Sequence, residues 1–405
     1  MAGKHPAAAA LIRVLAINLQ AAERVHHLSI RLITVSLVAA LFYLTSRCSG
    51  ALEWLRRRGV PAAYTWAGSA LVALLMWYEL RPISVAVAWM LFGIVLLELG
   101  MGRHNTPLRL QAYVALASSF LRMFFVNLNE VAVPGQISPR FYTVVPLAFA
   151  YYYAYRRVEA CQEQLSARRT LQLPQVFCWM GTITLAALMR FEIDLPDWVA
   201  AGWAALVLLL AAVAWRTGKR IFLHQAVLLA FAAMARAVLH NFYERSYFPP
   251  PRWESRWLTV GVPVALLFAV LPIAFRVRGA ARAAHEHLLG RTAAVFDSYP
   301  EQVFFFIPLV LMTVLLALET RRGMVTVSWG IEAVGVFLFA LWIGQRSYRL
   351  SGLALLLLSA GKILVVDVWR LNPRDRYITF IILGCALLLV SFLYSRHREA
   401  VRQYL

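Results

Sequence analysis

Four ionisable residues toward the end of the sequence have the types and spacing of a polar site inside an apolar region: Lys362, Glu332, Asp367 and Glu319. They lie within or beside long apolar stretches. An ionised side chain there costs at least ~2.5–3.5 kcal/mol on insertion scales, so it usually has a partner or a role. We treat these four residues as a candidate intramembrane cluster that binds a proton, an ion or a lipid headgroup.

Helix geometry predicts similar depths for two members of this cluster. Lys362 and Glu332 lie about five and about seven residues from the outer ends of their predicted helices, or roughly 8 and 10 Å at 1.5 Å per residue. An unpaired Glu at that depth favours the protonated form. Pairing with Lys362 is the simplest explanation. The alternative is structural, because a Lys side chain can extend to the interface from this depth.

The elements that must position these residues are membrane-spanning helices. Of the 405 residues, 61% are hydrophobic and 15% are charged, whereas about a quarter of a soluble domain is charged. A soluble enzyme and a secreted disulfide scaffold are therefore excluded. Apolar runs of roughly 20 residues, the length that crosses a bilayer, predict an all-α, polytopic membrane protein. Its thirteen predicted spans are 32–46, 62–79, 83–100, 109–128, 141–156, 174–191, 198–215, 221–240, 257–275, 302–319, 325–343, 350–368 and 377–395.

The distribution of Lys and Arg predicts the orientation. With thirteen spans the termini lie on opposite sides, and the loops on the C-terminal side carry roughly twice as many Lys and Arg, which marks the cytoplasmic side. We expect a multi-pass protein of the inner membrane with a cytoplasmic C-terminus. The N-terminal basic residues fall outside in this arrangement, unless residues 7–30 fold back as an interfacial segment.

The net charge of +20 indicates a bilayer partner, with anionic headgroups at the cytoplasmic face. Nucleic acid is not expected, because no basic cluster is joined to an aromatic platform on a soluble module. Other membrane proteins are the remaining partners to consider.

Charged and aromatic residues recur at a fixed spacing, which predicts three copies of a four-helix unit. A Glu ends the first span of each copy, a Trp follows ten or eleven residues later, and a cation lies 43 or 44 residues after the Glu. The acids are Glu79, Glu192 and Glu319; the tryptophans are Trp89, Trp203 and Trp329; the cations are Arg122, Arg236 and Lys362. An Asn or Asp stands five residues beyond each cation: Asn127, Asn241 and Asp367.

The predicted division has one leading helix and three repeats. The ranges are 1–61 for an N-terminal interfacial segment and the first helix, 62–157, 174–277 and 302–397 for the repeats, 158–173 and 278–301 for the linkers, and 398–405 for the tail. An even number of helices per repeat makes the copies parallel, unlike the inverted halves of many transporters. Within each copy, the simplest role for the cation is a structural ion pair with the Glu that ends the first helix.

The last predicted repeat contains a distinctive series of residues: Arg349-Leu350-Ser351-Gly352-Leu353, then Lys362 and Asp367, then Arg376, Phe380, Leu383-Gly384 and Ser391 to Tyr394. In these residues it resembles a bacterial family of many-helix membrane proteins of unknown function. The resemblance implies an integral bacterial membrane protein and brings no activity or catalytic residue with it. Members are commonly longer than this chain.

No motif predicts catalysis, a cofactor or a metal site. The chain has no GxSxG, HExxH or Walker sequence and no CxxC spacing. His224 and His240 lie sixteen residues apart on one span, too far to hold one haem or metal together. The favoured function is a non-catalytic structural or assembly subunit. A transporter or lipid- or glycolipid-handling protein that uses the third repeat is the alternative, and an envelope glycosyl- or acyltransferase is the next.

Overall fold

The computed structural model describes most of the chain. The described residues are 11–18, 24–25, 28–50, 59–131, 137–162, 173–247, 255–279, 296–321, 324–367, 369 and 373–396. Much of the predicted linkers and the tail after residue 396 therefore lies outside the described residues, as does the side chain of Asp367. The chain divides into two compact units, residues 1–196 and 197–405, and each is described by itself.

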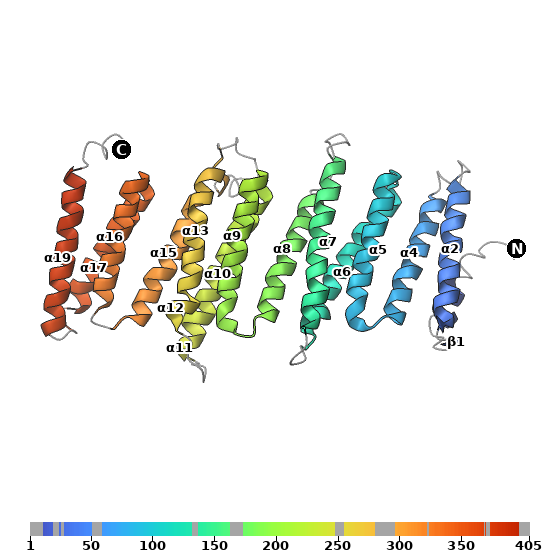
Figure 1. The fold of residues 1–405 in the computed structure, drawn as a ribbon, viewed down its shortest axis with the longest axis horizontal. Helices are drawn as coiled ribbons and strands as arrows, with labels where there is room; N and C mark the ends of the chain where they lie inside the picture. The colour runs from blue at the N-terminus through green and yellow to red at the C-terminus, as the bar shows by residue number, and fades with distance from the viewer. Residues whose placement is uncertain are drawn as a thin grey trace. The chain divides into compact units, whose positions relative to one another are not determined.

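The first unit is helical apart from one two-residue ladder. Strands β1 (Arg24–Val25) and β2 (Leu28–Ser29) pair antiparallel directly before the first long helix. The helices are η1 (Val14–Asn18), α2 (Ile30–Gly50), α4 (Val60–Glu79), α5 (Pro82–Gly102), α6 (Thr106–Phe125), η2 (Asn127–Asn129), α7 (Pro139–Gln162) and α8 (Leu173–Glu192), and η3 (Pro196–Trp198) crosses into the second unit. Consecutive helices run up and down, as Figure 1 shows.

The second unit contains helices throughout its described residues. They are α9 (Val199–Thr217), α10 (Arg220–Arg236), η4 (Ala237–Glu244), α11 (Arg245–Tyr247), α12 (Arg256–Thr259), α13 (Gly261–Val277), α15 (Pro300–Glu319), α16 (Val325–Ile343), α17 (Arg346–Lys362), η5 (Ile363–Asp367) and α19 (Pro373–Arg396). The π-helical segments η4 and η5 continue α10 and α17 without a break, so each forms one long rod (Figure 1).

A long helix overlaps each range predicted to span the membrane, and nine segments of the described residues are long and apolar enough to cross it. These are Ile30–Ser49, Val60–Glu79, Pro82–Gly102, Pro196–Thr217, Arg220–Tyr247, Arg256–Val277, Pro300–Glu319, Val325–Ile343 and Arg346–Val366. The all-helical membrane architecture is thus confirmed. Four predicted spans correspond to helices outside this set: α6, α7, α8 and α19. Arg140, Arg156 and Arg157 make α7 less apolar than the others.

Pro and Gly set many of the helix ends. Pro82 and Pro300 open α5 and α15, where the missing N–H has no intrahelical partner to lose. Gly218 and Gly344 end α9 and α16 with φ of 69° and 79°, a left-handed conformation that costs glycine little.

Helix pairs pack in a regular order within each unit. In the first unit α2 packs on α4, α5 on α6, and α7 on α8, while α5 also contacts α7. In the second unit α9 packs on α10 and α13, α13 on α15, and α16 on α17 and α19. Small residues allow the closest approaches, as is common between membrane helices. A Cβ at Gly100 of α5 would lie 2.8 Å from the backbone nitrogen of Arg109.

We predict that Gly100→Ala destabilises the α5–α6 pair. The added methyl group meets backbone that cannot rotate away, and overpacking of this kind costs about 1–3 kcal/mol. The matched control is Gly102→Ala, where an added Cβ meets nothing within 4 Å. Thermal unfolding of both variants in detergent is the measurement. Equal midpoints for Gly100→Ala and Gly102→Ala would show that this close contact is not a constraint.

Candidate functional site

The repeated tryptophans tie the second helix of a predicted repeat to its first helix. The indole Nε1 of Trp89 donates to the carbonyl oxygen of Ala73 at 3.0 Å, and Nε1 of Trp329 donates to that of Thr313 at 2.9 Å. Both bonds run from a Trp to a carbonyl sixteen residues earlier. In hydrocarbon, such a bond satisfies the one donor of an otherwise apolar side chain.

Two of the repeated cations, Arg122 and Lys362, lie over indole rings. The guanidinium carbon of Arg122 is 4.0 Å from the ring centre of Trp77 and 5.8 Å from that of Trp89. Nζ of Lys362 is 6.0 Å from the ring centre of Trp329 and donates to Oγ1 of Thr326 at 2.8 Å. Cation–π contacts gain strength when water is excluded. The Trp-to-cation spacing of 33 residues in all three copies is a signal that the sequence interpretation did not use.

The repeated acids bind the start of the helix that precedes their own. Glu79 accepts from Ser29 Oγ at 3.0 Å and forms an ion pair with Arg31 at 3.1 Å. Glu319 pairs with Arg256 at 3.1 Å. These acids therefore connect α4 to α2 and α15 to α12, whereas the sequence suggested the buried cation of the same repeat as the partner.

Glu192, the acid of the second predicted repeat, also binds the start of the preceding helix, but its partner is a serine hydroxyl. Oε2 of Glu192, at the end of α8, accepts from Ser138 Oγ at 2.8 Å, directly before α7. Arg140 of α7 donates to the carbonyl oxygen of Phe191 beside it. Arg236, the cation of this repeat, lies on α10.

The three members of the candidate polar cluster whose side chains the structure describes have different partners. Oε1 of Glu332 lies 3.0 Å from Oγ1 of Thr313 on α15, and its Oε2 is buried without a hydrogen bond among the described residues. Lys362 contacts Thr326 and Trp329, as described above. Glu319 is engaged by Arg256. The described contacts do not gather Lys362, Glu332 and Glu319 around one point.

In the first two predicted repeats, the amide five residues beyond the cation joins the third helix to the start of the second. Nδ2 of Asn127 donates to the carbonyl oxygen of Ile83 at 2.8 Å, and Nδ2 of Asn241 donates to that of Asp197 at 3.0 Å. Both Asn side chains are fully buried. These polar residues therefore make a repeated interhelical contact, where the sequence suggested only a marker of the membrane boundary.

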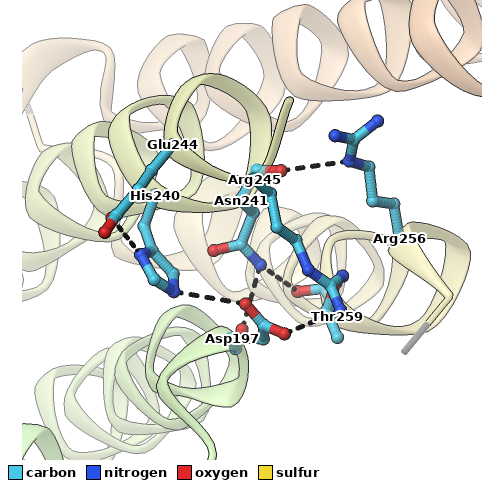
Figure 2. A network of polar contacts seen from close by, with 7 residues as sticks. All are labelled: Asp197, His240, Asn241, Glu244, Arg245, Arg256 and Thr259. Atoms are coloured by element: carbon cyan, nitrogen blue, oxygen red, sulfur yellow. Dashed lines mark hydrogen bonds and ion pairs between the residues drawn. The ribbon is translucent and has the colours of Figure 1, made fainter. Parts of the chain in front are cut away.

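In the second predicted repeat, charged side chains surround the contact between Asn241 and Asp197 and form a polar network, shown in Figure 2. The Asp197 carboxylate lies between His240 and Arg245: Oδ1 is 3.2 Å from Nε2 of His240, and Oδ2 is 2.9 Å from Nη2 of Arg245. Nδ1 of His240 contacts the Glu244 carboxylate one helical turn later. The sequence reasoning missed this network, which joins η3, η4 and α11.

Arg256 extends the network toward α15. It donates through Nε to the carbonyl oxygen of Asn241 at 3.2 Å, through Nη2 to Ser246 Oγ at 2.9 Å, and through Nη1 to Glu319. Its side chain is nearly buried. The guanidinium of Arg256 thus joins α12 to η4, α11 and α15.

Three residues of this network, Asp197, His240 and Arg245, have no acidic, histidine or basic counterpart in the first predicted repeat. At the matching positions of the first repeat, 114 residues earlier, Ile83 and Val126 stand in place of Asp197 and His240. The buried Asn is common to both copies, so the fold needs the amide contact, and the acid–histidine–arginine set is an addition. An alignment of the three repeats would have drawn attention to it.

The geometry of the network favours charge pairing over acid–base or metal chemistry. Asp197 is 13% exposed and is held by His240 and Arg245, so its oxygens are engaged. A nucleophile or general base must reach its substrate directly or through one water. Within the described residues, no group of three or more His, Cys, Asp or Glu side chains is arranged to hold a metal ion. His224, at the other end of α10, meets Asp297 instead, at 2.9 Å.

We predict that Asp197→Asn destabilises the second unit, because Arg245 and His240 then face a neutral amide. Breaking one partner of a buried ion pair costs about 3 kcal/mol or more. The double variant Asp197→Asn/Arg245→Gln should recover part of this loss, as expected for directly coupled residues. The control is Asp194→Asn, an exposed position three residues earlier. Unfolding in detergent measures all three, and strictly additive losses would contradict the pairing.

Long apolar helices, with their polar groups engaged with neighbouring helices, define an integral membrane protein with many helices. Over residues 4–397 the chain matches the family described as "Predicted membrane protein (DUF2339)", and it belongs to that family. The resemblance of the last repeat to a family of many-helix membrane proteins is thereby confirmed, and it extends over nearly the whole chain. No curated protein and no solved structure matches the chain.

Proposed function

We propose that the chain crosses the inner membrane thirteen times, as one leading helix and three parallel four-helix repeats, with its C-terminus in the cytoplasm. The repeats cover 62–157, 174–277 and 302–397. Support comes from the contacts that recur at fixed offsets, such as Trp89 to Ala73 and Trp329 to Thr313. The four less apolar helices, α6, α7, α8 and α19, carry basic residues in their sequences, which favour the membrane boundary.

The function proposed for this assembly is that of a non-catalytic structural or assembly subunit of a membrane complex. The observation that carries it is the use of intramembrane charge for contacts between helices. Glu79 binds Arg31, Glu319 binds Arg256, and Arg122 covers two indoles. Charged side chains that pair between helices hold the helix bundle together and leave few polar groups free for a substrate. A transporter instead needs polar groups along a water-accessible path.

We predict that the protein, solubilised gently from native membranes, migrates on a native gel as one discrete assembly larger than the single chain. Arg256→Gln should disperse that assembly, because it removes the contact between α12 and α15. The control is Arg321→Gln, an exposed position two residues after Glu319. Native gel electrophoresis after mild solubilisation is the measurement. A folded, single-chain species for the wild type at all detergent levels would reject the subunit function.

Transport, or handling of a lipid or glycolipid, is the second candidate, and one observation favours it. Glu332 has one carboxylate oxygen on Thr313 and the other buried without a hydrogen bond among the described residues. An incompletely bonded carboxyl group inside a membrane is a place where a proton or an ion can bind. An envelope glycosyl- or acyltransferase is the third candidate.

The two leading candidates differ in what Glu332→Gln should do. In a subunit the amide keeps the bond to Thr313, and the stability and assembly of the protein stay within about 1 kcal/mol of wild type. In a proton- or ion-coupled transporter the same change abolishes coupling. Proton or cation flux into proteoliposomes that contain wild type or Glu332→Gln separates them. Flux that wild type shows and the variant lacks favours transport.

A further inference from the structure

An apolar groove opens on the second unit between α13, α15 and α16, which are neighbours in Figure 1. Its cavity volume is about 570 Å³, within the range typical of ligand sites. Apolar and aromatic side chains and one glycine line it: Phe268, Leu271, Pro272, Phe275, Phe305, Gly335, Val336, Phe339, Trp342 and Ile343.

The floor of the groove is rigid, and its side is open. Phe305 is 1% exposed and stacks on Tyr348 at 3.7 Å between ring centres, so it has little freedom to fill the space. Trp342 at the rim is 83% exposed. Gly335 leaves room on α16, since a Cβ there would meet nothing within 4 Å. A flexible hydrocarbon chain entering from the bilayer fits a groove with these walls.

Apolar lining alone does not select among lipids, because every acyl chain in a bilayer is already in hydrocarbon. Selection must come from the headgroup. The groove runs to the C-terminal ends of α13 and α16, and basic residues stand directly beyond its lining residues. Arg276 follows Phe275, and Arg346 comes three residues after Ile343, past the turn at Gly344.

These two arginines carry charge that the described residues do not neutralise. Both are exposed. Arg276 lies over the ring of Trp215 at 5.0 Å, and neither Arg276 nor Arg346 forms an ion pair with a described acidic residue. Arg278 differs, because it pairs with Glu301 at 3.5 Å. Two arginines that follow the lining residues closely in sequence and have no acidic partner among the described residues complement a phosphate joined to an acyl chain in the groove.

We propose that this groove is a binding site for one anionic phospholipid, whose acyl chain lies against Phe305 and Phe339 and whose phosphate contacts Arg276 and Arg346. Such a site is independent of whether the chain is a subunit or a transporter. It assigns a ligand class to one defined place on the surface, which the overall positive charge of the chain does not do.

The test uses the purified full-length chain in detergent with added phosphatidylglycerol or phosphatidylcholine of identical acyl chains, and native mass spectrometry to count bound lipid. Gly335→Leu fills the groove. Gly384→Leu is the matched control, because it makes the same change on α19, where an added Cβ also meets nothing within 4 Å. Arg276→Gln/Arg346→Gln removes the headgroup contacts from exposed positions and leaves the helices intact.

We expect wild type and Gly384→Leu to bind phosphatidylglycerol at least about fivefold more tightly than phosphatidylcholine, since each basic residue near an anionic headgroup contributes roughly that factor. Gly335→Leu should lose this tightly bound lipid. The double Arg variant should bind both lipids equally.

Three results would overturn the site. The first is equal binding of the two lipids by wild type, and the second is retention of phosphatidylglycerol by Gly335→Leu at the wild-type level. The third is a wild-type dimer that Gly335→Leu dissociates, which would mean that a second copy covers the groove. If Gly335→Leu fails to fold, unchanged lipid selectivity in the double Arg variant overturns the proposal by itself.

Discussion

Polar groups inside a bilayer have no water to bind, so each must find a partner on a neighbouring helix or reach the interface. The contacts of this chain follow from that constraint. Indole N–H groups of α5 and α16 bond to carbonyl oxygens of the helix before them, a guanidinium lies over two indoles, and buried amides bond to the opening turn of a helix. Each contact joins two helices, so meeting the constraint also fixes which helices are neighbours.

The sequence predicted the helices well because length and continuous hydrophobicity are strong local signals. The spacing of Glu, Trp and cation also identified residues that the structure places between helices. Which partners they choose was not predictable from spacing alone. Glu79 and Glu319 were expected to bind the cation of their own repeat, and they bind Arg31 and Arg256 at the start of the preceding helix. The length of the side chains suggested pairing between the acid and the cation of the same predicted repeat. The packing of α4 on α2 and of α12 on α15 instead places each acid beside the arginine of the preceding helix.

The acid–histidine–arginine network was missed for a different reason. Asp197 is far in sequence from His240 and Arg245, and each of the three alone resembles an ordinary polar residue at a helix end. Of the residues in this region, the buried Asn241 has a matching amide, Asn127, in the first predicted repeat. Comparison of Asp197 with Ile83, and of His240 with Val126, separates what every copy needs from what one copy has gained. Similarly, Glu332 stands out in the third repeat because Phe92 and Leu206 occupy the matching positions.

The acid-to-arginine link has a consequence for how such chains change in length. Arg31 at the start of α2 pairs with Glu79 as Arg256 at the start of α12 pairs with Glu319, so α2 occupies the place beside α4 that α12 and α13 occupy beside α15. In the proposed repeats, the block that would be duplicated or deleted therefore begins with a helix that has an arginine at its start and ends with the helix that precedes the next such arginine. Duplication or deletion of a block with these boundaries would leave an arginine-bearing helix beside each Glu79-like or Glu319-like acid.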